Sequence, residues 1–177
     1  MVAGVSALVA SFTVTGPFEI PTRVGRTGAR HVDSRALDEF WEVAGCDERI
    51  GCYVFGIRSG RGTIPHYVGR TTASFEGECF QQHKIGKYND VLLDTLKGTP
   101  VMYFVTLDRG RGRPNETAIF ALEERLIALG KQRNPELKNI SGTKETAITV
   151  HRVMGAGRVQ GAPRIPERRF KAMMAIR

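Results

Sequence analysis

A glutamate on an otherwise apolar helix face is the first sign of chemistry in this chain. Residues 115–129 have the periodicity of a helix, and at about 100° per residue their apolar side chains form one arc. Glu123 falls near the middle of that arc, whereas Glu124 falls at its edge. A carboxylate that faces a core is costly unless it is paired or bound to a metal. Two interpretations of Glu123 therefore stay open: a metal ligand, or the acid of a buried ion pair with an arginine.

Two tyrosines form a second candidate group. Gly51-Cys52-Tyr53-Val54-Phe55 and His66-Tyr67-Val68-Gly69 are strand-like runs, and the Gly-rich segment 59–62 lies between them. This pattern is typical of a β-hairpin. On adjacent antiparallel strands, Tyr53 and Tyr67 can face the same side, with their hydroxyls near each other. Tyrosines in strands are commonly half-buried packing residues, so packing is the alternative to a chemical role.

Basic side chains follow the second tyrosine. A free tyrosine titrates near about pH 10, so a base at neutral pH needs positive charge nearby. Arg70 and Lys84 are placed to supply that charge, and a plain surface cation is the alternative for each. His83 follows Cys79 by four residues, which predicts that the two share a helix face. A lone helical histidine is more often structural or exposed than catalytic.

The order and spacing of these segments resemble the GIY-YIG nuclease superfamily over about residues 50–140. The resemblance implies a small α/β (α+β) domain in which helices flank a three-stranded antiparallel sheet. It implies that Tyr53 is the general base or positions the nucleophile, and that Glu123 is the single metal ligand, for Mg²⁺ or Mn²⁺. His83 stands where relatives carry a histidine or tyrosine that contacts the reacting phosphate or the attacking water. Asn139 matches the closing asparagine that ties the site loop together.

One position departs from the family pattern. Relatives usually carry an arginine four residues before the histidine or tyrosine, where it stabilises the pentacoordinate phosphate. Cys79 stands there in this chain, or Gly77 if the helix is not shifted. Neither residue can stabilise an oxyanion with a charge, and such a clamp is worth several kcal/mol of transition-state stabilisation. Either Arg70, Lys84 or Lys87 replaces it, or the protein is a weak or inactive member.

The chain is expected to have three parts. Residues 1–48 are an N-terminal extension with short strands and a helix at about 34–44. Residues 49–145 are the GIY-YIG-like domain. Residues 146–177 are an edge strand and a basic tail of the kind that becomes ordered on a partner.

Strand and helix signals fill the central part. Strands are predicted at 52–57, 65–70 and 101–107 from their β-branched and aromatic content. Ser74 and Asn115 are predicted to cap helices, the second of which ends at about Gly130. A further short helix is predicted to start at Asn89 and to end at Gly98.

The net charge of +8 points to a polyanionic partner. The segment 152–177 holds seven arginines and lysines against one acid, Glu167. The Arg-Gly-Arg-Pro core of the 109–114 loop looks like an AT-hook, which enters narrow minor grooves, and a solvated loop is an equal alternative. Double-stranded DNA is the expected partner, and charge does not exclude RNA. The expected nucleic-acid contacts are Arg109, Arg111, Arg113, Arg158, Arg164, Arg168, Arg169 and Lys171.

The remaining signals concern the compartment. The three cysteines, Cys46, Cys52 and Cys79, lack metal-ligand spacing and suit a reducing cytosol. No apolar run is long enough to span a membrane, and the apolar start lacks the basic region of a signal peptide. A cytoplasmic protein with no membrane partner is therefore expected.

The sequence thus predicts a Mg²⁺- or Mn²⁺-dependent DNA endonuclease of restriction, phage-defence or mobile-element type. Because each chain has one site, cutting both DNA strands requires either a homodimer or two successive binding and cleavage events by one chain. One alternative is a catalytically inactive nucleic-acid-binding module on the same scaffold. Another is a structural ribosome-associated protein, which accounts for the charge but not for Glu123. The predicted catalytic residues are Tyr53, Tyr67, Arg70, His83, Lys84 and Glu123.

Overall fold

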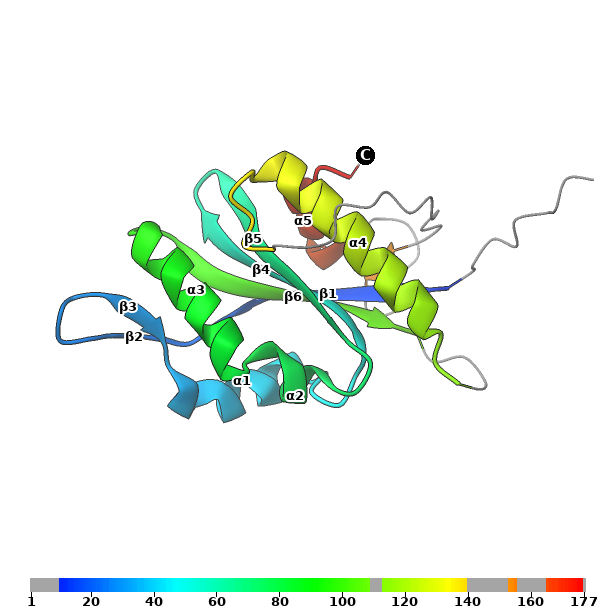
Figure 1. The fold of residues 1–177 in the computed structure, drawn as a ribbon, viewed down its shortest axis with the longest axis horizontal. Helices are drawn as coiled ribbons and strands as arrows, with labels where there is room; N and C mark the ends of the chain where they lie inside the picture. Colours follow the sequence, from blue (N-terminus) through cyan, green and yellow to red (C-terminus); the bar gives the residue numbers. More distant parts are fainter. Residues whose placement is uncertain (1–9, 109–112, 140–152, 156–164, 177) are drawn as a thin grey trace, which may run out of the picture.

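A β-sheet forms the centre of the protein (Figure 1). The structure, a computed structural model, describes residues 10–108, 113–139, 153–155 and 165–176. Within these residues the sheet has five strands in the order β5-β4-β6-β1-β7. Neighbours from β5 to β1 are antiparallel, and β7 runs parallel to β1. The strands are β1 (Phe12–Glu19), β4 (Gly51–Ser59), β5 (Gly62–Thr71), β6 (Thr99–Leu107) and β7 (Val153–Gly155).

The sheet is larger than the three-stranded sheet expected from the sequence. The three expected strands are present as β5, β4 and β6, and they are neighbours in the sheet. β1 joins beyond β6 because Phe12 and Val14 bury their side chains on the sheet, while Thr13 lies between them. The segment expected to be an N-terminal extension therefore contributes a strand of the main sheet. The coarser expectation, a mixed α+β fold with helices flanking an antiparallel sheet, is confirmed.

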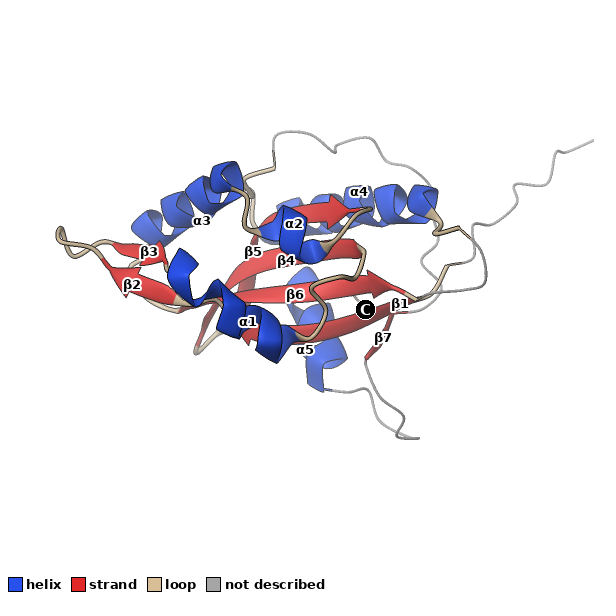
Figure 2. Ribbon diagram, turned by 90° about the horizontal axis from the view of Figure 1, so that it is seen from below, coloured by secondary structure: helices blue, strands red, loops and turns tan. Residues whose placement is uncertain are grey.

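Helices cover both faces of the sheet (Figure 2). Because side chains alternate along a strand, Tyr53 and Phe55 of β4 face one layer, while Cys52 and Val54 face the other. The first layer holds α1 (Leu37–Ala44), α2 (Phe75–Cys79) and α3 (Gln82–Asp94). The second holds α4 (Glu116–Arg133) and α5 (Ile165–Met174). Between β1 and α1 lie β2 (Thr22–Val24), β3 (Arg30–Val32) and the 3-10 turn η1 (Ser34–Ala36).

Three predicted helix ends are confirmed. The Ser74 hydroxyl accepts a hydrogen bond from the backbone N–H of Gly77 at 3.1 Å, at the start of α2. The Asn115 side chain accepts one from the N–H of Ala118 at 3.1 Å, at the start of α4. Gly45 ends α1 in the left-handed conformation, with φ of 60°. These ends were predictable because each depends on a polar cap or a glycine that is local in sequence.

The prediction of a separate helix from Asn89 is wrong, because α3 runs unbroken past this residue. The Asn89 side chain instead accepts a hydrogen bond from the backbone N–H of Val32 at 2.9 Å, which fastens β3 to α3. α4 also continues beyond Gly130, its predicted end, to Arg133. Gly130 leaves room for the Leu137 side chain to pack against α4, since a Cβ on Gly130 would lie 3.1 Å from Leu137 Cδ2.

The last part of the basic tail is a helix of the core, which corrects the expectation of a segment ordered by a partner. Phe170, Met173 and Met174 of α5 are buried against the sheet, and the Phe170 ring centroid lies 5.6 Å from that of Tyr103. Of the predicted edge strand, residues 146–152 lie outside the described residues, and Val153 begins β7. Within the described residues, no helix has the length and apolar character needed to cross a membrane.

Phe170→Ala should lower the free energy of unfolding by about 3–5 kcal/mol, the usual cost of removing a buried aromatic ring. Arg168→Ala is the matched control, because it changes an exposed position of the same helix and should shift stability by less than about 0.5 kcal/mol. Urea unfolding of both variants measures the difference. Equal stability of the Phe170 variant and wild type would contradict the packing of α5 on the sheet.

Candidate functional site

An ion pair joins the end of β5 to α4. Arg70, one residue before the end of β5, pairs with the Glu123 carboxylate of α4. Arg70 lies opposite Cys52 in the strand register, so it projects from the face that α4 and α5 cover. The Glu123 side chain is 13% exposed and that of Arg70 is 37% exposed. The ion-pair interpretation of Glu123 therefore describes the structure, and the pair is partly open to solvent.

An aromatic ring supports the arginine of this pair. The guanidinium carbon of Arg70 lies 4.0 Å from the ring centroid of Phe120, which precedes Glu123 by one helical turn. Phe120 is itself among the exposed large apolar residues. A guanidinium over an aromatic face gains electrostatic attraction from the ring. Arg70 is thus held by two side chains of α4, one charged and one aromatic.

Tyr53 and Tyr67 lie together on the other face of the same hairpin. Their ring centroids are 6.2 Å apart and both side chains are buried. Gly69 is the cross-strand partner of Tyr53, and a Cβ at Gly69 would lie 2.3 Å from the Tyr53 hydroxyl. The glycine of the Tyr67-Val68-Gly69 run is therefore required so that the Tyr53 ring can lie across the neighbouring strand.

The tyrosine hydroxyls are poorly suited to act as bases. Burial raises the pKa of the Tyr53 hydroxyl above its usual range, and the adjacent Tyr88 hydroxyl raises it further. Within the described residues, the Tyr53 hydroxyl makes no hydrogen bond of good geometry, although it lies close enough to the Tyr67 and Tyr88 hydroxyls to lower the pKa of each by hydrogen bonding. Burial also raises the pKa of Tyr67, against a smaller lowering by Arg70. In this state the Tyr53 hydroxyl is closed to solvent, and its phenolate is not available at neutral pH.

Lys84 is a buried cation, so the surface alternative for it is wrong. Its side chain is 4% exposed and its ammonium pairs with Glu78 of α2. The Lys84 ammonium lies 5.4 Å from the ring centroid of Tyr53, as the expectation of positive charge beside that residue requires. Lys87 lies similarly over Tyr67, at 4.8 Å. Lys84 thus neutralises an acid inside the structure.

His83 and Cys79 do not share a helix face. α2 ends at Cys79 and α3 begins at Gln82, so the chain turns between them. Cys79 is fully buried, whereas His83 is exposed near the start of α3. Tyr88 sets this junction by donating a hydrogen bond from its hydroxyl to the Cys79 carbonyl at 2.9 Å. The periodicity argument failed here because it assumed one continuous helix.

Two asparagines after α4 hold the outer edge of β5. Asn139 accepts a hydrogen bond from the Val68 N–H at 2.9 Å and donates one to the Val68 carbonyl at 2.7 Å. Asn134 donates to the Pro65 carbonyl at 2.9 Å. The tying role expected of Asn139 agrees with this geometry. The role of Asn134 was missed, although its position after α4 and before a proline marked a chain turn.

The structure thus places the predicted catalytic residues in two groups. Arg70 and Glu123 lie on the α4 face of the hairpin, while Tyr53, Tyr67 and Lys84 lie on the other face. The two groups approach each other at β5, an edge strand that carries both Tyr67 and Arg70. Arg70 is near enough to Tyr67 to affect its pKa. His83 is exposed on α3 and belongs to neither group.

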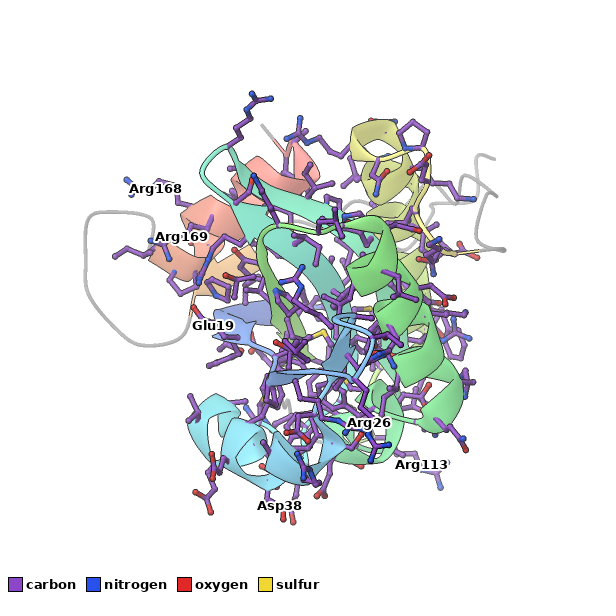
Figure 3. The ribbon with its side chains drawn as sticks, turned by 90° about the vertical axis from the view of Figure 1, so that its left-hand side faces the viewer. Glu19, Arg26, Asp38, Arg113, Arg168 and Arg169 are labelled. Atoms are coloured by element: carbon purple, nitrogen blue, oxygen red, sulfur yellow. The ribbon has the colours of Figure 1, made fainter. Side chains whose placement is uncertain are left out.

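The predicted nucleic-acid contacts are only partly described. Arg109, Arg111, Arg158 and Arg164 lie outside the described residues. Arg113 is exposed just before α4. Figure 3 shows Arg168 and Arg169 on α5 and Arg113 elsewhere on the molecule. Lys171 of α5 is paired with Glu167 at 2.9 Å.

A metal ion at this site would depend on one carboxylate. Within the described part of the chain, no group of three or more His, Cys, Asp or Glu side chains could hold a metal. Glu123 is nevertheless a suitable donor, because Mg²⁺ is commonly held by one or two carboxylates together with water and substrate phosphate. Binding there would require Glu123 to give up part of its pairing with Arg70.

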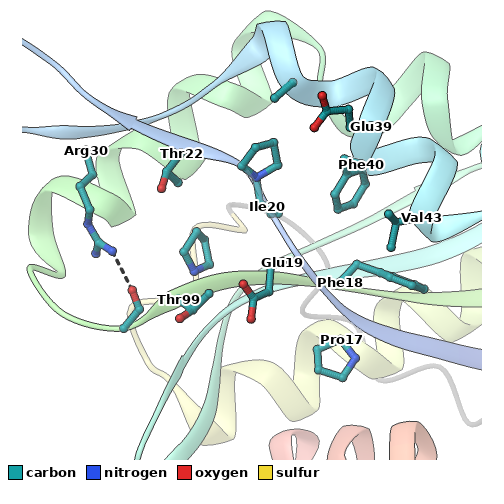
Figure 4. Close-up of a pocket in the computed structure, with 14 residues that line it drawn as sticks. Pro17, Phe18, Glu19, Ile20, Thr22, Arg30, Glu39, Phe40, Val43 and Thr99 are labelled. Carbon is teal, nitrogen blue, oxygen red and sulfur yellow. Dashed lines mark hydrogen bonds between the residues drawn. The ribbon is translucent and has the colours of Figure 1, made fainter.

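A separate cavity of about 670 Å³ lies between α1, the end of β1 and the start of β6 (Figure 4). Phe18, Ile20 and Phe40 line it, with Glu39 at its side. Arg30 also lines it and donates to the Gly98 carbonyl at 2.7 Å. None of the predicted catalytic residues lines this cavity.

Comparison of the chain with family models, with curated proteins and with solved structures gave no match. The function therefore has to be argued from the residues and geometry described above.

Tyr53→Phe should change stability at neutral pH by less than about 1 kcal/mol, because it removes a buried hydroxyl that makes no hydrogen bond of good geometry. The folded state keeps the Tyr53 proton above about pH 10, where an unfolded tyrosine loses it. The free energy of unfolding of the wild type should therefore fall as the pH rises above about 10, and less steeply in Tyr53→Phe. Urea unfolding at neutral and alkaline pH measures this. A neutral-pH loss of more than about 1 kcal/mol would show that the hydroxyl has a partner.

Proposed function

We propose that the protein is a divalent-metal-dependent endonuclease that hydrolyses phosphodiester bonds in double-stranded DNA. The observation that carries the proposal is the partly exposed Arg70–Glu123 pair at the end of the tyrosine-bearing hairpin. It combines a carboxylate able to hold a metal with a guanidinium able to contact phosphate bidentately. The net charge of +8 supports a polyanionic substrate.

The order of elements also supports the proposal. A hairpin (β4 and β5), two helices (α2 and α3), a strand (β6) and the Glu123 helix (α4) follow one another along the chain. This is the order in which the motifs that resemble the GIY-YIG superfamily occur. Tyr53 and Tyr67 lie on one face of the hairpin, and Asn139 is bonded to the strand that carries Tyr67.

Each residue has a role that follows from its surroundings. Glu123 would hold Mg²⁺ or Mn²⁺, and the chemistry supplied there would be positive charge at the leaving oxygen. Arg70, released in part from Glu123, binds a phosphate oxygen and remains over the Phe120 ring. Tyr53 and Tyr67 stay protonated, because burial raises the pKa of both. Tyr67, the more exposed of the two, orients the water or phosphate by a hydrogen bond, and the buried Tyr53 ring packs against it.

Arg70 is the best replacement for the arginine that relatives carry on the first helix. Cys79, which stands near that position, is fully buried. Lys84 is almost fully buried and already paired with Glu78. Arg70 is more exposed and lies beside the proposed metal ligand. A charge at this point stabilises the developing negative charge of the transition state.

A non-catalytic nucleic-acid-binding module is the second candidate. The observations that favour it are the neutralisation of Glu123 by Arg70 and the burial of the Tyr53 hydroxyl. These two features would remove the catalytic site, while the fold and its positive charge would still allow the protein to bind nucleic acid. Cleavage assays separate the two candidates, since only the nuclease requires Glu123 for product formation.

Glu123→Gln should reduce Mg²⁺-dependent cleavage by at least about 10²–10³-fold, the cost of removing one charge-stabilising group. Metal-free DNA binding should be unchanged or tighter, because a negative charge is removed. Glu124→Gln is the matched control on the adjacent position of α4 and should keep most of the activity. Cleavage of a labelled duplex with Mg²⁺ or Mn²⁺ measures both variants. Equal losses would contradict the assignment of Glu123.

Arg70→Gln should lower the cleavage rate by about 10²–10³-fold with only a small loss of DNA affinity, because the charge acts mainly on the transition state. Arg125→Gln, at an exposed arginine of α4, is the control and should behave as wild type. Single-turnover rates and metal-free binding give the two readouts. A change in affinity as large as the change in rate would make Arg70 a simple binding residue.

A further inference from the structure

We infer that Arg58 of β4 and Arg169 of α5 form a phosphate-binding surface that holds the backbone of a nucleic-acid duplex at the turn end of the β4–β5 hairpin. We call Arg58, Arg61, Arg168 and Arg169 the hairpin–α5 surface. The inference deepens the proposed function, on which its partner class rests. It assigns duplex binding to a folded surface at the opposite end of β5 from Arg70 and Glu123.

Packing of α5 creates this surface. Phe170, Met173 and Met174 turn the apolar side of the helix toward the sheet, and Phe170 packs on Tyr103 of β6. Arg168 and Arg169 are consequently exposed, and Figure 3 shows both on the outside of α5. Residues that are remote in sequence from the hairpin are thus brought beside it.

Arg58 and Arg169 lie on the same side of the molecule. Arg169 adjoins Phe170, whose ring packs on Tyr103, and Arg58 lies opposite Thr63 in the hairpin. Burial raises the pKa of the Tyr103 hydroxyl, and Thr63, Arg169 and Arg58 each lower it in part. Arg58 pairs with Glu19 at the end of β1. Figure 3 shows Glu19 on the same side of the molecule as Arg168 and Arg169. Two arginines from different elements therefore lie on one side of the molecule, near the Tyr103 end of the α5 contact.

The acids near this surface are too few to neutralise it. Glu19 is the one carboxylate paired with Arg58, and its side chain is 63% exposed. Glu167, the acid of α5, is paired with Lys171. Within the described residues, Arg168 and Arg169 have no ion pair. Like charges gathered without acids repel each other, and a polyanion relieves that repulsion while it releases counterions.

The hairpin–α5 surface and the Arg70–Glu123 pair lie on one face of the hairpin. Cys52 and Val54 of β4 face α4 and α5, and Arg58 continues the same alternation. Arg70 lies opposite Cys52 on that face. At about 3.3 Å per residue, the path along β4 from Cys52, opposite Arg70, to Arg58 is roughly 20 Å. Six base pairs of duplex span about the same length, at about 3.4 Å each.

α4 and α5 cover this face between the two ends, so a duplex that contacts both would have to pass over the outside of these helices. Guanidinium groups suit contacts with its backbone because they bind phosphate oxygens bidentately. Such contacts position the duplex and carry no sequence information.

The test compares two double variants with the same loss of charge. Arg58→Gln with Arg169→Gln removes the surface, and Arg23→Gln with Arg26→Gln removes two exposed arginines of the β2–β3 hairpin. Binding of the full chain to a labelled DNA duplex is measured by fluorescence anisotropy without metal, over about 0.05–0.3 M salt. The first variant should bind roughly 10–100-fold more weakly at about 0.1 M salt, with a salt slope lower by about two units. The control should change by less than about threefold, and Arg58→Lys with Arg169→Lys should recover most of the slope.

Equal effects of the two glutamine variants, or no effect of either, would overturn the inference. So would loss of binding to anionic lipid vesicles with unchanged duplex binding, which would assign the surface to a membrane. Circular dichroism melting of each variant excludes unfolding as the cause. Because no metal is present, the outcome is independent of cleavage. An inactive protein whose duplex binding still depends on Arg58 and Arg169 would refute the nuclease and keep this surface.

Discussion

The ion pair between Arg70 and Glu123 is the interaction on which the account of this protein depends. It links the last residues of an edge strand to the middle of the helix that covers one face of the sheet. Arg70 stays more than one-third exposed, so water screens the pair and loss of either partner would cost about 1–2 kcal/mol. A pair of this kind contributes little net stability over apolar packing. The Arg70–Glu123 pair is better explained by its effect on position, because it keeps the guanidinium and the carboxylate next to each other at the end of β5.

The sheet divides the candidate chemistry between its two faces. Tyr53 and Tyr67 lie beneath α2 and α3, with Lys84 of α3 over Tyr53, while Arg70 of β5 pairs with Glu123 of α4 on the other face. β5 is the element that belongs to both groups, and it lies at the edge of the sheet. A phosphate that contacts residues of both groups has to approach along this edge. The close contact of the Tyr53 ring with Gly69 brings the tyrosine group as near to the edge as the backbone permits.

The features that sequence patterns predicted well are those that depend on neighbouring residues. The hairpin, the Ser74 and Asn115 caps and the strand that became β6 all carry their signals within a few positions. The features that were missed depend on distant contacts. The sequence around Asn89 does not show that its side chain bonds Val32, and nothing near Lys84 shows that it is buried with Glu78. The apolar residues of α5 were obscured by the many arginines around them.

In the candidate site, too, features set by nearby residues were predicted and features set by distant contacts were missed. Periodicity identified Glu123 as an unusual acid and offered an ion pair as one explanation, and Arg70 proved to be the partner. The continuity assumed between Cys79 and His83 failed because a turn separates α2 from α3. Burial of Tyr53 could not be judged from its strand alone, since it depends on Gly69 across the hairpin and on Phe75 from α2.

The most direct test of the central claim is a time course of supercoiled plasmid DNA with the purified wild-type chain, with and without divalent metal. The account predicts conversion of supercoiled to nicked plasmid in Mg²⁺ or Mn²⁺ and none in the presence of a chelator. Absence of nicking in either metal, under conditions in which the protein binds the plasmid, would contradict it and leave the nucleic-acid-binding module as the function of this fold.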